Sequence, residues 1–102
     1  MKNVHTMNEI REMLLPIFTS NPIEKAILFG SYAKGVATPL SDIDIMIDSN
    51  GQVRGIDFFG IRGELSDVLE KDVDLIEASQ LVDGGRIQRE IEKTGVVIYE
   101  KA

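Results

Sequence analysis

The chain has 102 residues, of which 43% are hydrophobic, and this composition is typical of a single packed globular domain over residues 1–102. Its 17 acidic residues outnumber 11 basic ones, and the net charge of −6 argues against a direct nucleic-acid surface, which needs clustered Lys and Arg. The absence of cysteine excludes disulfides and thiolate chemistry. No stretch approaches the roughly 20 apolar residues of a membrane span. Because the first residues also lack the apolar core of a signal peptide, we expect a cytoplasmic protein with no membrane contact.

The first quarter of the chain predicts a helix followed by a buried strand. Thr6 and Glu9 form a capping-box pattern ahead of apolar residues at helical spacing. Pro16 is expected to kink this helix or to make its last turn irregular. The short apolar run from Ala26 to Phe29 is typical of a buried strand. A brief helical turn is expected after Gly30, which ends that strand.

The remainder of the chain alternates predicted strands and helices. A strand is expected from Asp42 to Asp48, and a helix capped by Asp57 follows it. The alternation from Lys71 to Glu77 predicts a third strand. A last helix is expected after Asp83, and a final strand from Val96 to Tyr99. The order predicts an α/β (α+β) domain, a small mixed sheet flanked by helices.

Two aspartates at alternate positions of the second strand are the most informative feature of the sequence. Side chains at i and i+2 of a strand lie on the same face, so Asp42 and Asp44 project side by side. The intervening Ile43 faces the opposite, buried side together with Ile45 and Ile47. Adjacent carboxylates repel each other unless a cation lies between them. Hard oxygen ligands suit Mg²⁺, which often shares its coordination with substrate phosphates.

A third carboxylate is needed, because two side chains rarely hold the pair of Mg²⁺ ions, about 4 Å apart, that assists phosphoryl transfer. Asp74 lies in the middle of the third strand, from which a neighbouring strand could bring it beside Asp42 and Asp44. Asp72 shares its face but lies at the start of the strand, so it ranks second. The alternative is that both residues only solvate an exposed face; the upstream pair favours Asp74 as a ligand.

Gly30 and Ser31 follow the first strand and precede the paired aspartates by a fixed distance. A Gly-Ser pair is usually only a turn. Its backbone N–H groups and the Ser31 hydroxyl could instead hold the phosphates of a nucleotide. Lys34 could reach a phosphate too, although a solvated surface lysine is an equally good interpretation. The sequence contains neither of the two common glycine-rich phosphate motifs, G-x-x-x-x-G-K-[ST] and G-x-G-x-x-G.

The pattern GS-x₁₀-D-x-D, within the segments LFGSYAKG and SDIDI, resembles the minimal nucleotidyltransferases of the DNA polymerase β-like superfamily. The resemblance runs from about Ile10 to Tyr99 and includes the VDL segment around Asp74. It implies a polymerase β palm-like fold. It also implies that Asp42, Asp44 and Asp74 form the catalytic site and bind two Mg²⁺ ions, with Asp74 helping to deprotonate the attacking hydroxyl. Gly30 and Ser31 would hold the triphosphate of ATP.

Larger members of this superfamily add a substrate-recognition domain, so the acceptor surface is expected to come from another protein. The chain is similar to the MntA-type antitoxins of HEPN/MNT toxin–antitoxin pairs. This resemblance implies transfer of AMP from ATP to a tyrosine of a HEPN-domain ribonuclease toxin, which silences the toxin. Two alternatives stay open: a non-catalytic antitoxin that acts by binding alone, and a nucleotidyltransferase that acts on a small molecule or an RNA end.

Overall fold

The computed structural model describes residues 4–102. Four strands are seen there, β1 (Lys25–Phe29), β2 (Ile43–Asp48), β3 (Val73–Glu77) and β4 (Val96–Glu100). They form one sheet in the order β3-β2-β1-β4. Strand β1 runs antiparallel to both β2 and β4, whereas β2 and β3 are parallel. The predicted small mixed sheet flanked by helices is confirmed.

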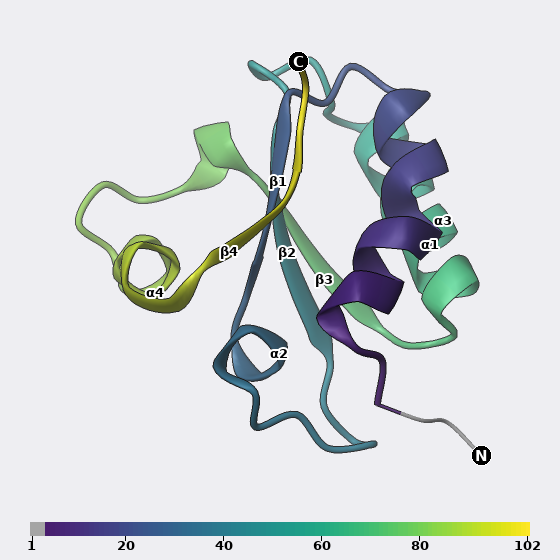
Figure 1. The fold of residues 1–102 in the computed structure, drawn as a ribbon. Helices are drawn as coiled ribbons and strands as arrows, with labels where there is room; N and C mark the ends of the chain where they lie inside the picture. The colour runs from purple at the N-terminus through teal and green to yellow at the C-terminus, as the bar shows by residue number, and fades with distance from the viewer. Residues whose placement is uncertain (1–3) are drawn as a thin grey trace.

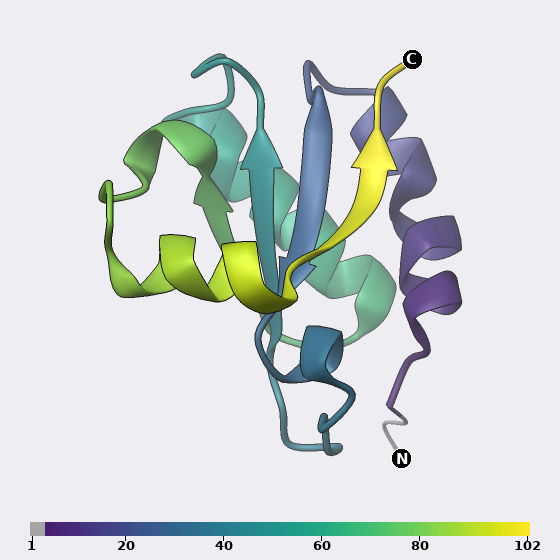
Figure 2. The ribbon, with the colours of Figure 1, turned by 60° about the vertical axis from the view of Figure 1, so that its left-hand side comes forward.

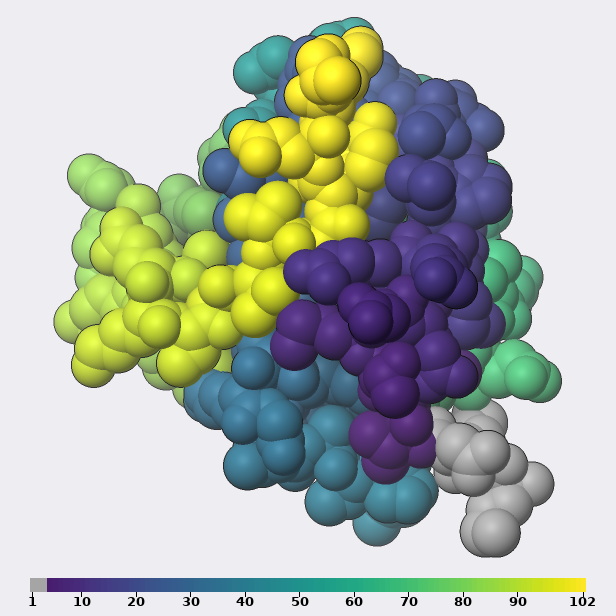
Figure 3. Space-filling view, in the orientation of Figure 1, coloured from purple at the N-terminus to yellow at the C-terminus, as the bar shows by residue number. Residues whose placement is uncertain are grey.

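The helices lie unequally on the two faces of the sheet. Helices α1 (Met7–Thr19) and α3 (Ile56–Leu69) pack side by side over one face, and α4 (Arg86–Thr94) lies alone on the other (Figures 1 and 2). The one-turn helix α2 (Ser31–Lys34) follows β1, and the 3₁₀ turn η1 (Ala78–Gln80) follows β3. In the space-filling view α4 projects from one side of the molecule, above the α2 segment (Figure 3). One sheet face is therefore fully covered and the other only in part.

The hydrophobic core lies between the sheet and the α1–α3 layer. Ile43, Ile45 and Ile47 are fully buried there, as their spacing predicts. Leu14 of α1 and Leu65 of α3 pack onto them from the helix side. Since alternate residues of β2 form this core, Asp44 must face the half-covered side of the sheet. Within residues 4–102 no helix is long and apolar enough to span a membrane.

Local signals account for most boundaries of the helices and strands, with two corrections. The predicted capping box is confirmed, because Thr6 Oγ1 accepts from Glu9 N at 3.1 Å and Glu9 Oε1 accepts from Thr6 N at 2.7 Å. Helix α1 contains Pro16 and ends at Thr19, with Ser20 as its C-cap, so one turn follows the proline. The kink expected at Pro16 stays a prediction. The expectation that Asp57 caps α3 is wrong: Gly55 is the N-cap, and Asp57 lies in the first turn. Strand β2 begins one residue late, after Asp42.

Candidate active site: an acidic cleft on the half-covered sheet face

A cleft of about 540 Å³ opens on the half-covered face of the sheet. Four segments contribute to it: the junction of β1 and α2, the start of β2, the strand β3 and the first turns of α4. Its lining consists of Phe29, Gly30, Ser31, Ser41, Asp42, Asp44, Asp74, Leu75, Ile76, Arg86, Ile87 and Glu90. The cleft therefore contains five of the six residues that the sequence ranks first for the site, and Lys34 is the sixth.

The register of the two parallel strands brings the predicted carboxylates together. Asp44 of β2 pairs directly with Asp74 of β3, so both side chains rise from the same face of the sheet. Asp42 immediately precedes β2 and lines the same cleft. Asp72 lies before β3 and does not line it. Of the two candidates for a third carboxylate, the structure thus brings Asp74, and not Asp72, to the paired aspartates.

Asp44 has an unusual electrostatic environment. The pKa of Asp44 is raised from the ordinary 3.8 to about 6. The larger cause is its partial burial, and the next is the negative charge of its neighbours Asp74, Asp42 and Glu90. Both causes disfavour the ionised carboxylate, and the second increases with each acidic neighbour. A cation bound among these groups would remove the repulsion. The cleft is thus arranged for a positive ligand, or for an anion accompanied by metal ions.

Gly30 forms the floor of the cleft and is packed tightly against Asp44. Its φ of +75° lies in the region that favours glycine. A Cβ built on Gly30 would lie 2.1 Å from Asp44 Oδ2. Phe29 pairs with Asp44 across β1 and β2, so the hairpin register brings the next residue beneath the carboxylate. Glycine is therefore required here by the carboxylate itself, in addition to any close approach of a phosphate.

Ser31 and Lys34 lie at the two ends of α2 and have different surroundings. Ser31 is half-buried and lines the cleft. Lys34 does not line it; its Nζ lies 3.2 Å from Glu90 Oε1 in an ion pair that joins α2 to α4. The role of Ser31 at a phosphate stays a prediction, as does that of Lys34, which would have to leave Glu90 to reach one.

The donor set fits Mg²⁺ in kind. Carboxylate oxygens, a serine hydroxyl and an open cleft are what this hard ion takes, with substrate phosphates completing its coordination. Within residues 4–102, however, no three acidic or histidine side chains surround a common point. The cleft thus provides ligands of the right type, and their final convergence would accompany ion binding.

Helix α4 supplies three cleft residues that sequence reasoning missed as site residues. The mixed-charge segment from Arg86 to Lys93 suggests a solvent-exposed face or a docking surface. Instead, Arg86, Ile87 and Glu90 line the cleft. A signal was present in the sequence: Arg86 and Glu90 are four residues apart and flank the apolar positions that pack on the sheet. Arg86 is the one basic residue in the lining within the described part of the chain.

The fold and this cleft define a small α/β domain with three carboxylates beside a glycine turn, the arrangement of a nucleotidyl-transferring enzyme. The family model that matches is "Polymerase beta, Nucleotidyltransferase", over residues 12–102. The chain belongs to this family and is a nucleotidyltransferase. Two proteins of Methanocaldococcus jannaschii, named as predicted protein adenylyltransferases, are 34% identical to it over 70 and 80 residues. The alignments cover 69% and 74% of this chain and 75% and 82% of the relatives.

Solved structures share the fold. A crystal structure of a toxin–antitoxin with AMP-PNP superposes with a TM-score of 0.77 at 20% identity, covering 89% of this chain and 73% of that one. A tri-AMPylated Shewanella oneidensis HEPN toxin in complex with MNT antitoxin gives 0.73 at 17% identity, with coverages of 94% and 74%. A minimal nucleotidyltransferase gives 0.73 at 20% identity, with coverages of 90% and 95%. At these identities the likeness establishes the fold.

Proposed function

We propose that this protein is a Mg²⁺-dependent protein adenylyltransferase that transfers AMP from ATP to a tyrosine of a HEPN-domain toxin and thereby acts as its antitoxin. The observation that carries the proposal is the cleft itself. Asp42, Asp44 and Asp74 lie together beside Gly30 and Ser31, in a chain of the nucleotidyltransferase family. Carboxylates of this kind next to a turn rich in backbone N–H groups suit a metal–triphosphate substrate.

The comparisons support the finer parts of the proposal. Relatives that are 34% identical carry the name of protein adenylyltransferases. Two structures with the same fold are described as a toxin–antitoxin with AMP-PNP and as an AMPylated HEPN toxin with MNT antitoxin. The first favours an adenine nucleotide as substrate. The second favours a HEPN protein as the acceptor.

Each residue of the cleft has a separate role in the proposed reaction. A bond forms between the acceptor oxygen and the α-phosphorus, the bond from that phosphorus to the bridging oxygen breaks, and pyrophosphate leaves. Asp74 takes the proton of the acceptor hydroxyl. Gly30 and Ser31 hold the phosphates in line with the attack. Two Mg²⁺ ions held by Asp42, Asp44 and Asp74 would supply the positive charge that stabilises the attacking and leaving oxygens.

The acceptor must come to the mouth of the cleft. In-line displacement requires its hydroxyl within about 3.5 Å of the α-phosphorus, so the partner has to dock over the three carboxylates. Asp42 and Asp74 are both exposed there and contribute to an acidic mouth. A basic surface, of the kind that holds RNA in a ribonuclease, would be complementary to it. Docking would then cover the same partner surface that binds RNA.

The experiment compares Asp44→Asn with Asp48→Asn, a matched control on the same strand and the same face but outside the cleft. Each variant is incubated with ATP, Mg²⁺ and the proposed HEPN-domain partner, and the mass of the partner is measured by mass spectrometry. We expect Asp48→Asn to transfer AMP as the wild type does. Asp44→Asn should leave the partner unmodified and should fail to protect cells from its toxicity.

Other outcomes would overturn the proposal in distinct ways. If Asp44→Asn protected cells fully, the protein would neutralise its partner by binding alone. If the wild type consumed ATP but left the partner unmodified, the acceptor would be a different molecule, such as a small compound or an RNA end.

A further inference from the structure

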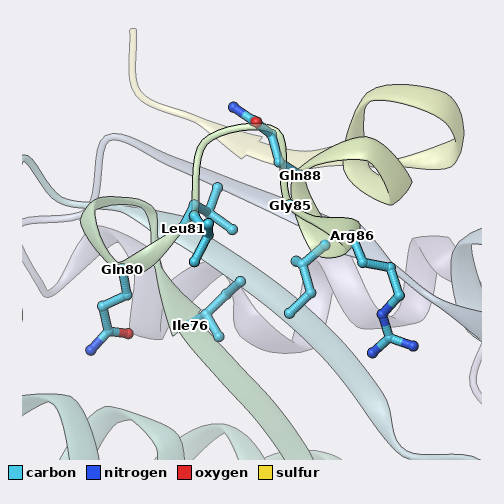
Figure 4. A pocket seen from close by; sticks show the side chains of 8 residues that line it. Ile76, Gln80, Leu81, Gly85, Arg86 and Gln88 are labelled. Atoms are coloured by element: carbon cyan, nitrogen blue, oxygen red, sulfur yellow. The ribbon is translucent and has the colours of Figure 1, made fainter.

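A second cavity, of about 390 Å³, lies beside the acidic cleft, where β3, η1 and the start of α4 meet. Its lining is Ile76, Gln80, Leu81, Val82, Gly85, Arg86, Ile87 and Gln88. Figure 4 shows Ile76 on the strand pointing toward Leu81 in the loop above it. Four of the lining side chains are aliphatic, and this volume is within the range of small-molecule sites.

The cavity and the cleft adjoin each other. Ile76, Arg86 and Ile87 line both of them. Ile76 follows Asp74 by two residues on β3 and therefore rises from the same face of the sheet. A ligand whose phosphates lie over Gly30 and Asp44 could thus extend past Ile76 into the cavity without leaving the protein surface.

The walls of the cavity are held in place before any ligand arrives. Gly85 N donates to Val82 O at 2.9 Å, which closes the loop onto the start of α4. Gln80 Oε1 accepts from Glu77 N at 3.1 Å, and Gln88 Oε1 accepts from Gly84 N. The amide oxygens of Gln80 and Gln88 therefore both accept hydrogen bonds from the backbone around the loop. The cavity is lined mainly by aliphatic side chains.

We propose that this cavity binds the base of the nucleotide substrate by apolar contact with the faces of its ring. The proposal rests on the proposed function, since it needs a nucleotide in the adjoining cleft. A flat heteroaromatic ring suits an aliphatic cavity that adjoins the proposed phosphate site. Val82, a residue that is 72% exposed, gains cover when such a ring lies against it. Arg86 lies at the junction of the two spaces, where the ribose and phosphates would pass.

The first test uses fluorescence, because the chain contains no tryptophan. Val82→Trp puts a single indole on the cavity wall. Val68→Trp, on the outer side of α3, is the matched control. We expect Mg²⁺–ATP to quench the indole of Val82→Trp by stacking of the base. Mg²⁺–tripolyphosphate, which has no base, should leave its fluorescence unchanged, and neither ligand should affect the control.

The second test separates the base from the phosphates by calorimetric titration. Leu81→Ala removes one wall of the cavity and none of the cleft. We expect its affinity for Mg²⁺–ATP to fall about tenfold, the effect of one lost base contact, and its affinity for Mg²⁺–tripolyphosphate to stay within about twofold.

The outcomes distinguish the two proposals. If the wild type binds both ligands, but Leu81→Ala binds ATP normally and the indole of Val82→Trp is not quenched, the base lies elsewhere and this inference is wrong. If the wild type binds neither ligand, the nucleotide site of the proposed function is itself overturned. Should Leu81→Ala fail to fold, the fluorescence of Val82→Trp decides.

Discussion

At the scale of single residues, Gly30 and Asp44 determine each other's position. The hairpin register brings the glycine beneath the carboxylate, and any Cβ there would overlap Asp44 Oδ2. The carboxylate can lie low in the cleft, half-buried and next to Asp74, only because this position has no side chain. The glycine turn and the paired aspartates of the sequence are thus one structural unit.

Gly30→Ala should therefore disturb the site as well as the fold. Gly55 is a matched control, because its φ of +63° and ψ of −133° resemble the +75° and −152° of Gly30, with no atom near a built Cβ. We expect Gly55→Ala to lower the free energy of unfolding by about 1–2 kcal/mol through backbone strain. Gly30→Ala should cost about 2 kcal/mol more and should also lose Mg²⁺–ATP binding. Urea denaturation and titration measure both, and equal effects of the two variants would contradict the argument.

Asp44 also makes the stability of the metal-free protein depend on pH. Its pKa is raised from 3.8 to about 6, by burial first and then by its acidic neighbours, so the folded state binds this proton more tightly than the unfolded state. The contribution of Asp44 to wild-type stability should fall as the pH rises from about 4 to about 6, and then level off. The difference between these two pKa values corresponds to a free energy of about 3 kcal/mol, but solvent screening of this half-exposed group reduces that free energy to about 1 kcal/mol.

Asp44→Asn should remove the loss of stability that accompanies ionisation of Asp44. In EDTA at pH 7 we expect the variant to be about 1 kcal/mol more stable than the wild type in urea denaturation, with the difference vanishing near pH 4. Mg²⁺ should stabilise the wild type at pH 7 and have little effect on the variant. If the wild type were the more stable protein without metal, the repulsion assigned to the acidic cluster would be wrong.

At the scale of elements, the sequence predicts each strand and each α-helix, but neither the 3₁₀ turn η1 nor how the elements are assembled. Alternation in β2 and β3 is visible because one face of each strand is buried. Asp42 and Asp44 line the same cleft, although Asp42 lies just before β2. Strand order and register depend on long-range contacts, so the pairing of Asp44 with Asp74 could only be a hypothesis. The contribution of α4 was missed for the same reason, since Arg86 comes from a distant segment whose charge suggests solvent.

The turn after β2 is held by a buried carboxylate that sequence reasoning also missed. Glu77, at the end of β3, accepts from Ser49 N at 2.9 Å, from Ser49 Oγ at 2.7 Å and from Gly51 N at 3.3 Å. It accepts from Ser79 N at 2.7 Å and from the Ser79 hydroxyl as well. Burial alone would raise the pKa of Glu77, but the hydrogen bonds from Ser79 and Ser49 outweigh it and lower the pKa to about 2. The charge thus fixes the end of β3 against the turn.

Glu77→Gln should destabilise the fold without touching the cleft. The substitution replaces one acceptor oxygen with an NH₂ group, which would then lie against the N–H and O–H donors of Ser49 or Ser79. We expect the free energy of unfolding to fall by about 2–3 kcal/mol at pH 7. Because the pKa of Glu77 is lowered, the wild type should lose this advantage as the pH falls from 4.5 toward 2. Asp48→Asn, which affects one exposed bond from Asn50 N, should cost under about 0.5 kcal/mol. Equal losses in urea denaturation would contradict the special role of Glu77.

At the scale of the whole molecule, the uneven distribution of helices produces the site. Two helices bury one sheet face, and the single helix α4 lies on the other (Figure 2). The cleft and the adjoining cavity are both lined by residues of β3 and α4. The acidic residues of the cleft then lie in a protein of net charge −6. A basic partner would be attracted by the whole molecule and guided to one place by the local cluster.

This predicts how association with the proposed HEPN partner depends on salt and on position. Raising NaCl from about 50 mM to about 500 mM should lower the association rate constant about tenfold in stopped-flow measurements, because screening shortens the range of attraction. Asp42→Asn, at the cleft, should lower the rate constant several-fold at low salt. Asp67→Asn removes the same charge from exposed α3, on the opposite face, and should change it by less than about twofold. Equal effects of the two variants would mean that net charge alone drives the encounter, and that the partner does not approach through the cleft.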